Sequence, residues 1–485
     1  MQMDFSYGDF KEGWRQGCFN PPKYFSPYTG IEPRLLHDYY SDERHKKKSI
    51  LDALNEIEKR SDNKYAKKLL PLARYSLAYA TDVFPIFDLL YAEVIAEDWL
   101  GMVGWHKFQR DHLIHQPLTA YTVLKMLRGW NGEKGEEHLM IGGQSLLDHC
   151  VDAVLFNEEC YPFRQYLRDM YLQKCNSKKK FADTLFPEPE EVYGANGEYD
   201  ENLRNQKRNQ NPKYQLWRML FIETAFVAAM FHDIGYPWEY IQRLSKALSQ
   251  AKTKFVLHHN GSDIAPRDFQ HRLLYLVLNG YQYMEMGQPL QWENDVEKRI
   301  EDGLDETHGL PGALTFLLLN DIFRDYPKDK SHTWHLRQFV IEWASVAICM
   351  HDLSRIYRGK DSHGKDRKAG LCPERPSMRV SFDKDPLSSI LCLADFIQDF
   401  ERHSASHTKH KDGSNYLKFE QDCDKVSLKI DNNKATIDFH FTNDASRKYK
   451  EHYIKQEREE LFFTTTGYLD FSSCGINEFD VRCSS

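Results

Sequence analysis

The sequence predicts a mainly α-helical protein with a small α+β region near its C-terminal end. Two observations indicate the helical body. Apolar residues recur at spacings of three to four from about residue 50 to residue 405, and several long runs are apolar on almost every side, which is typical of buried helices. A third observation indicates the α+β region: from Val426 onward apolar and polar residues alternate on both sides of an Asp-Asn-Asn-Lys turn, which is a β-hairpin pattern.

The spacing of apolar residues predicts each helix of the body in turn. The run at 216–231 is apolar on nearly every face, so we expect it to lie at the centre of the body. The predicted helices cover residues 50–77, 80–100, 117–127, 146–155 with a continuation towards 171, 216–231, 268–279, 312–322, 339–350 and 386–400.

These elements divide the chain into three predicted regions. Residues 1–104 form an arm, irregular over the first 45 residues, and helices that pack on the body. Residues 105–405 form the main helical domain, and a charged, turn-rich stretch at about 175–214 is either a surface insertion or a lid over an active site. Residues 406–485 form the α+β region, with a regulatory or oligomerising role. Its strands are expected at 426–430, 437–441, 468–471 and 479–481, with a helix at 446–460.

The composition excludes several classes of protein. Apolar residues make up 41% of the 485 and aromatic residues 13%, which is enough for a large core and excludes a disordered chain. No run approaches 18 uninterrupted apolar residues, and the first residues lack the pattern of a secretory signal, so we expect a cytoplasmic protein with no membrane span. The ten scattered cysteines are then expected to be reduced thiols. A net charge of −8 argues against a protein that coats DNA.

Histidine and aspartate residues at the ends of apolar runs are the most informative feature of the sequence. A carboxylate carried to the edge of a core costs several kcal/mol unless it is paired or bound to a cation, and both residue types are ordinary ligands of divalent metals. Five apolar segments end or begin in this way, so we predict that they share one polar centre that binds metal. The residues are His115, His232-Asp233, His308, His351-Asp352 and Asp395.

This ordered set resembles the HD-domain superfamily of metal-dependent phosphohydrolases, and its surroundings are similar to those of soluble bacterial HD proteins. The resemblance covers about residues 105–402 and implies an HD-type helical bundle. The segments that carry it are Arg-Asp-His-x-x-His at 110–115, Phe-His-Asp-Ile-Gly-Tyr-Pro at 231–237, His-Gly-x-x-x-Ala at 308–313, Met-His-Asp at 350–352, and Asp-Pro-Leu at 385–387 before Leu-Ala-Asp at 393–395.

The resemblance implies a site for divalent metal. One ion, of Mn, Fe, Mg, Co, Ni or Zn, would be held by His115, His232, Asp233 and Asp395. His149, which also lies in an apolar segment, is an alternative to His115 as the first ligand.

Two further histidines of this sequence, His308 and His351, resemble the additional metal ligands of the two-metal members of the family. In that arrangement Asp233 is expected to bridge two ions and to be a catalytic residue, and the ions would activate a water molecule. Arg110 and His112 lie within about a turn of the first ligand and are candidates to bind a phosphate and to protonate the leaving group.

Three further residues are candidates for binding substrate. Arg355 and Arg358 follow His351 at plus four and plus seven, which places them on roughly its side of a helix, although a solvated surface would explain them too. His258 lies in a turn-like His-His-Asn cluster that belongs either to the site or to a surface loop.

The family implies a hydrolase of phosphate esters or anhydrides, first of all a deoxynucleoside triphosphate triphosphohydrolase of the dGTPase type. Its expected partners are a nucleotide substrate, a nucleotide effector and further copies of the same chain. One alternative is a phosphodiesterase of cyclic or linear dinucleotides. Two others are a di-iron HD oxygenase that cleaves C–C or C–P bonds and a nucleotide-binding regulator.

Overall fold

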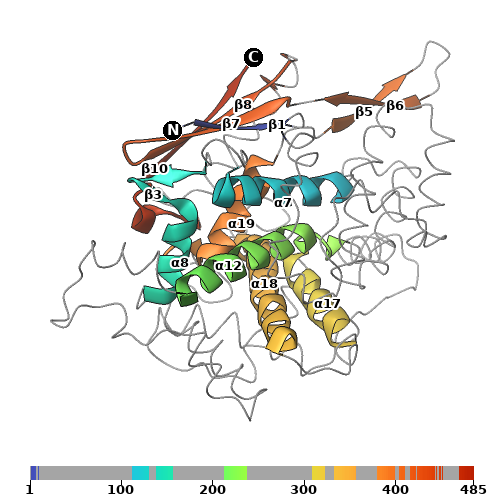
Figure 1. Cartoon of the computed structure of the whole chain (residues 1–485). Coiled ribbons are helices and arrows are strands. Elements are labelled where there is room, and N and C mark those ends of the chain that lie inside the picture. Colours follow the sequence, from blue (N-terminus) through green and yellow to red (C-terminus); the bar gives the residue numbers. More distant parts are fainter. Residues whose placement is uncertain are drawn as a thin grey trace, which may run out of the picture.

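The part of the chain that the computed structural model describes is mostly helical and carries a small mixed sheet, as predicted (Figure 1). None of the helices in this part is long and apolar enough to cross a membrane. The predicted helices at 50–77, 80–100 and 268–279 lie outside it, and so does the predicted turn-rich stretch at 175–214 except for its last three residues, which begin a helix at Pro212. The division into three regions stays a prediction. The described residues are 2–6, 9, 112–129, 138–156, 212–236, 308–322, 332–356, 380–398, 403–409, 415–421, 423–442, 444, 447–448, 451 and 469–485.

Helix α12 lies among the other helices of the described body and contacts four of them: α7, α8, α18 and α19. Its central place explains why its sequence is apolar all round. Trp217 and Phe221 of α12 pack edge-on against Trp343 of α18, with ring centroids 6.0 and 5.6 Å apart. The helices are α7 (His112–Arg128), α8 (Leu146–Phe156), α12 (Pro212–Phe231), α17 (Gly309–Ile322), α18 (His332–Ile356) and α19 (Pro386–Ile397).

Two helix boundaries differ from the predicted ones in ways that matter for the site. Helix α7 begins at His112, five residues before Pro117, although proline is most common in the first turn of a helix. Helix α18 continues to Ile356, so His351 lies within the helix and not at its end. Helix α19 begins at Pro386 as predicted, because the Asp385 side chain accepts a hydrogen bond from the Ser388 backbone N–H at 3.0 Å.

The C-terminal strands form a four-stranded sheet in the order β1-β7-β8-β10. The predicted hairpin is confirmed: β7 (Lys425–Asp431) and β8 (Lys434–His440) are joined by Asn432 and Asn433, both in the left-handed region with φ of 46° and 64°. β10 (Glu478–Ser484) pairs parallel to β8.

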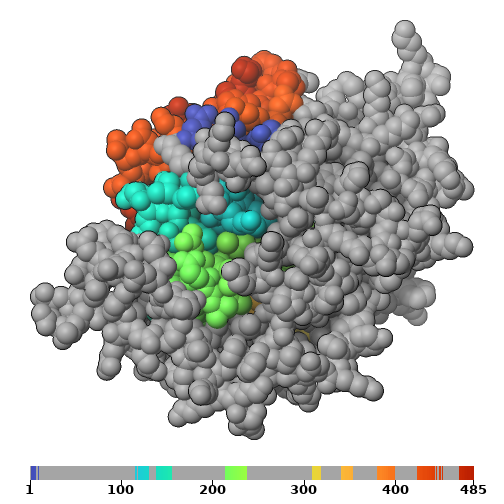
Figure 2. Space-filling view, in the orientation of Figure 1, coloured from blue at the N-terminus to red at the C-terminus, as the bar shows by residue number. Residues whose placement is uncertain are grey.

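The fourth strand of this sheet corrects the prediction of an irregular first segment. Residues 2–6 form β1 (Gln2–Ser6), which pairs antiparallel to β7 and buries Met3 and Phe5 on the inner face. Figure 2 shows this strand, in blue, between the orange C-terminal strands and α7. On α7, Lys125 donates hydrogen bonds to the backbone oxygen of Asp4 and to the Asp9 carboxylate. Residues 2–6 and Asp9 therefore link the C-terminal sheet to helix α7 of the helical body.

Three two-stranded pairs complete the described secondary structure. The hairpin of β5 (His403–Lys409) and β6 (Asn415–Gln421) spans the predicted boundary near residue 405, where no strand was predicted. The other pairs are β2 (Met140–Ile141) with β3 (Gln144–Ser145), and β4 (Val380–Ser381) with β9 (Leu469–Asp470). A short 3-10 helix, η6 (Ser472–Cys474), follows β9.

Helices and sheet share one hydrophobic core in the described part. Phe396 of α19 meets Phe439 of β8 edge-on at 5.7 Å between ring centroids, so the helix that carries Asp395 is packed directly on the sheet. The cysteines described are free thiols, as expected, and all but Cys483 are buried.

Candidate metal centre

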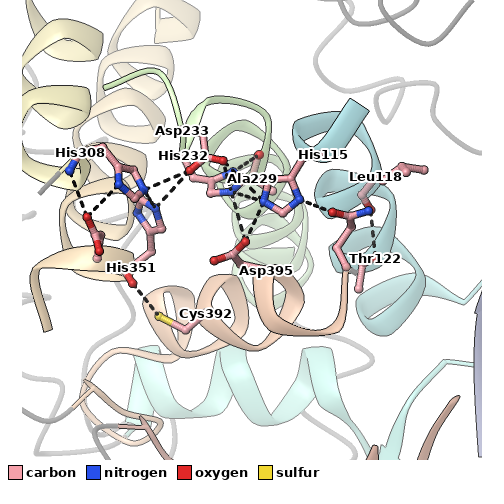
Figure 3. A network of polar contacts seen from close by, with 12 residues as sticks. His115, Leu118, Thr122, Ala229, His232, Asp233, His308, His351, Cys392 and Asp395 are labelled. Carbon is pink, nitrogen blue, oxygen red and sulfur yellow. Dashed lines mark hydrogen bonds and ion pairs between the residues drawn. The ribbon is translucent and has the colours of Figure 1, made fainter. Parts of the chain in front are cut away.

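Histidine and aspartate side chains from five separate elements meet inside the helical body (Figure 3). They are buried: the exposed fraction is 5% or less for the four histidines and Asp233, and 14% for the Asp395 side chain. The contributors are His115 of α7, His232 and Asp233 of the turn after α12, His308 immediately before α17, His351 of α18 and Asp395 of α19.

A glycine brings the turn after α12 against the start of α17. Helix α12 ends at Phe231, and the chain turns so that the Tyr236 N–H donates to Asp233 O at 3.1 Å. A Cβ at Gly235 would lie 1.9 Å from the backbone oxygen of His308, so no larger residue fits there. The close approach, which places Asp233 beside His308, explains the glycine that follows His-Asp-Ile in the sequence.

The first group of ligand atoms is called subsite A and consists of His115, His232, Asp395 and one oxygen of Asp233. His115 Nε2 lies 3.1 Å from His232 Nε2, 2.8 Å from Asp395 Oδ1 and 3.5 Å from Asp233 Oδ2. His232 Nε2 lies 3.5 Å from Asp395 Oδ1 and 3.4 Å from Asp233 Oδ2. Four side chains from three elements thus point at one place.

The second group is called subsite B and consists of His308, His351 and the other oxygen of Asp233. His308 Nε2 and His351 Nε2 are 3.1 Å apart and lie 3.2 and 3.6 Å from Asp233 Oδ1. Asp233 therefore presents one carboxylate oxygen to each subsite, which is the geometry of a bridging ligand (Figure 3).

All four imidazoles turn Nε2 into the centre and Nδ1 towards an oxygen outside it. His232 and His351 place Nδ1 2.8 and 2.6 Å from the backbone oxygens of Ala229 and Ile348, each one turn earlier in the chain. His115 Nδ1 contacts the Gln398 side-chain oxygen, and His308 Nδ1 lies 3.0 Å from Asp352 Oδ2.

This orientation determines which ring nitrogen can bind a cation. Backbone and carboxylate oxygens only accept hydrogen bonds, so the Nδ1 atoms carry the protons and the Nε2 lone pairs face one another. Two such lone pairs 3.1 Å apart repel unless a cation or a proton lies between them. The chemistry of the donors therefore fits a metal ion in each subsite.

The electrostatics of the centre agree with this arrangement. Burial alone would raise the pKa of Asp395, but its contacts with His115 and His232 outweigh burial and hold that pKa well below its ordinary value. Burial alone would lower the pKa of His308, yet the carboxylates of Asp352 and Asp233 hold it well above the ordinary value. Asp395 is thus ionised, and the high pKa of His308 shows that its surroundings favour a positive charge at that place.

The separations have the size expected around an ion. Ligand atoms bound at about 2.1 Å from one divalent ion are about 3.0–3.4 Å apart for octahedral or tetrahedral angles. The observed separations within the two subsites run from 2.8 to 3.6 Å. Ligand atoms of His115, His232 and Asp395, and separately those of His232, Asp233 and His351, also lie within 4.8 Å of one another.

The structure brings His115, and not His149, to the other predicted ligands. His149 lies on α8 with its Nε2 3.0 Å from the backbone oxygen of Ile141, so it contacts the β2 strand. Of the two alternatives for the first ligand, only His115 has the required position.

The predicted phosphate-binding and acid residues are not placed by the structure. His112 and Arg355 belong to α7 and α18, but their side chains lie outside the described part. Arg110, His258 and Arg358 lie outside it altogether. Their roles stay predictions.

Two residues beside the centre, Gln398 and Tyr236, were not predicted from the sequence to act there, and a third, Asp352, was predicted to lie at the centre but was given no role as a ligand. Asp352 and Gln398 hold the rings of His308 and His115 by Nδ1, and Tyr236 stacks on the His308 ring with centroids 3.9 Å apart. A second His-Asp dipeptide in the sequence was the only signal for Asp352.

No protein-family model, curated protein or solved structure matches this chain.

Proposed function

We propose that the protein is a metal-dependent phosphohydrolase that acts on nucleotides, with deoxynucleoside triphosphates as the first substrate class. The observation that carries this proposal is the position of Asp233, whose two oxygens face subsite A and subsite B. Bridged pairs of divalent ions are a common device for hydrolysing phosphate esters and anhydrides. The resemblance of the ordered ligand set to HD-domain phosphohydrolases supports the same reaction class and suggests the nucleotide substrate.

In this proposal, separate sets of the chain's residues would bind each of the two metal ions. A bound divalent ion supplies Lewis acidity, which lowers the pKa of a coordinated water and neutralises phosphate oxygens. His115, His232 and Asp395 would hold one ion and His308 and His351 the other, with Asp233 shared between them. Because these side chains are buried, their charges act in a medium of low dielectric constant and are stronger than in water.

Cationic side chains near the ligands would bind the substrate. We propose that Arg110 and His112, close in sequence to His115, contact the phosphate and protonate the leaving group. Arg355 and Arg358, which follow His351, would bind further phosphate oxygens, and His258 is a weaker candidate for the same role. A net charge of −8 is compatible with a polyanionic substrate, since two ions and a few arginines set the local field.

The test is a panel of nucleoside triphosphates, cyclic and linear dinucleotides and simple phosphate esters, each supplied with Mn, Fe, Co, Ni, Mg or Zn. We expect hydrolysis of a deoxynucleoside triphosphate to the nucleoside and triphosphate. His232→Ala and Asp233→Ala should lower metal affinity and turnover by about 100-fold or more. His149→Ala, a histidine outside the cluster, is the matched control and should keep both.

Two results would overturn the proposal. Metal-replete protein that hydrolyses no phosphate compound with any of the six metals excludes a phosphohydrolase. Unchanged metal content in His232→Ala and Asp233→Ala excludes the assigned site. Release of a mononucleotide from a dinucleotide, without action on triphosphates, would favour the phosphodiesterase.

A second candidate function, a di-iron oxygenase, is favoured by the composition of the same centre. Four histidines and two aspartates in two bridged subsites also suit a pair of iron ions, and imidazole and carboxylate are both ordinary ligands of iron. Consumption of oxygen by the iron-loaded protein, with cleavage of a C–C or C–P bond, would support this function. Phosphate release without oxygen consumption excludes it.

A further inference from the structure

Asp352 is adjacent to a predicted ligand but turns its side chain away from the metal position. It follows His351 on α18, yet its Oδ2 accepts two hydrogen bonds from His308, one from the ring Nδ1 and one from the backbone N–H, each at 3.0 Å. A single carboxylate oxygen thus fixes both the backbone and the ring of a residue 44 positions away.

Asp352 is also the only charged group among the four described acceptors of the imidazole Nδ1 atoms. His115 is held by the amide oxygen of Gln398, and His232 and His351 are held by backbone oxygens. A carboxylate on Nδ1–H makes Nε2 a stronger donor to a metal than a neutral oxygen does, and it fixes the ring's orientation.

The two subsites differ in the carboxylate oxygens that reach them directly. Subsite A receives Oδ1 of Asp395 and Oδ2 of Asp233, whereas subsite B, among the described residues, receives Oδ1 of Asp233 alone. The Asp352 carboxylate lies behind the His308 ring, so it supplies negative charge to subsite B through that imidazole. Tyr236, stacked on the ring at an interplanar angle of 17°, leaves the ring little freedom to turn.

We propose that Asp352 is a positioning residue that gives subsite B its affinity for the second metal ion, acting through His308 without binding the ion itself. The inference rests on the proposed two-metal function and goes beyond it. It makes the subsites unequal: loss of the Asp352 charge should empty subsite B and leave subsite A filled.

The test is a titration of the full-length chain and its Asp352→Asn variant with Mn²⁺, by equilibrium dialysis and electron paramagnetic resonance. The wild-type chain should bind two ions and give the spectrum of a coupled pair. The variant should bind the second ion about 10- to 100-fold more weakly, keep the first with unchanged affinity, and give a single-ion spectrum. Asp152→Asn, which alters a buried carboxylate of α8 in contact with Gln144 and Tyr214, is the matched control and should retain both ions.

A second pair of variants separates positioning from a general loss of structure. If Asp352 acts through His308, then His308→Ala and His308→Ala/Asp352→Asn should have equal affinities for both ions. In a background that lacks the His308 ring, Asp352→Asn has no ring contact left to break, so the comparison isolates the effect that passes through the ring.

Several outcomes would overturn the inference. They are wild-type affinity for the second ion in Asp352→Asn, equal loss of both ions in that variant, or a further loss in the double variant. A wild-type chain that binds two ions while Asp352→Asn does the same refutes this inference and leaves the proposed function intact. A wild-type chain that binds a single ion refutes the inference as well, and one that binds no ion refutes both.

Discussion

Two acidic residues, Glu223 within α12 and Asp233 in the turn after it, are buried in different surroundings. Asp233 faces four histidines, whose Nε2 atoms lie 3.2 to 3.6 Å from its carboxylate oxygens. Glu223, within α12, is 6% exposed, and burial raises the pKa of its carboxyl to about 7. The carboxyl group on α12 is therefore half-protonated near pH 7, whereas that of Asp233 lies among the histidines of the centre.

The Glu223 carboxyl predicts a pH-dependent stability. Its ordinary pKa is 4.5, so between pH 4.5 and about 7 the unfolded chain releases a proton that the folded chain keeps. Stability therefore falls as the pH rises through this window, by up to about 3 kcal/mol. Glu223→Gln should be more stable than the wild type by this order above pH 7 and equally stable below pH 4.5. Urea unfolding at a series of pH values measures the difference, and a gain that does not vary with pH contradicts the prediction.

At this scale the sequence was informative about residues that stand beside apolar runs. His115, His232, Asp233 and Asp395 were predicted to meet, because a polar group at the end of a buried helix needs a partner. Nothing local marks Gln398, whose partner is 283 positions away along the chain.

Local sequence also failed to separate His115 from His149. Both follow the helical pattern, and only tertiary packing turns one into the centre and the other towards β2. Such choices depend on contacts between elements, which periodicity does not record.

Backbone meets backbone where the turn after α12 contacts the start of α17. Three glycines lie there: Gly235 and Gly312 face each other, and a Cβ at Gly309 would lie 2.9 Å from the Cys349 backbone oxygen. The small residues allow three segments that carry ligands to approach within backbone contact.

Gly235→Ala is therefore expected to destabilise the protein and to disturb subsite B. The added Cβ would lie 1.9 Å from His308 O and 2.6 Å from Gly312 N, so the backbone must move. We expect a loss of about 1–3 kcal/mol in the free energy of unfolding and a weaker second metal ion. Urea unfolding and metal titration measure both, with the exposed Ser473→Ala as a control. Wild-type stability and metal affinity in Gly235→Ala would show that the contact is not required.

Elements with strong local periodicity were predicted well, and those that depend on distant pairing were not. The apolar runs fixed α12, α17 and α19 to within a few residues, because one buried face repeats every turn. β1 is only five residues long, and three of them are polar, so its sequence pattern is too short to predict a strand. The strand depends on its pairing with β7, which lies far away in the sequence. β5 and β6 were missed for a similar reason, since a hairpin rich in polar residues has no marked apolar face.

The metal centre joins segments that are distributed over most of the helical body, from His115 to Asp395. Ions bound there would hold α7, α12, α17, α18 and α19 together, and binding to the folded chain alone stabilises it. Removing the metal with a chelator should lower the melting temperature of the wild type by several degrees and leave that of Asp233→Ala unchanged. Differential scanning calorimetry with and without chelator measures this, and equal shifts in the two proteins contradict the assignment.

The pairing of β1 with β7 affects the timing of folding during synthesis on the ribosome. Asp4 and its partner Lys425 are 421 positions apart, so at about 5–20 residues per second the ribosome releases β1 roughly 20–80 s before the strand it pairs with. Throughout that interval Met3 and Phe5 have no sheet to enter. β1 can therefore dock only after β7 has been made, and the nascent chain has to shield these side chains during that interval.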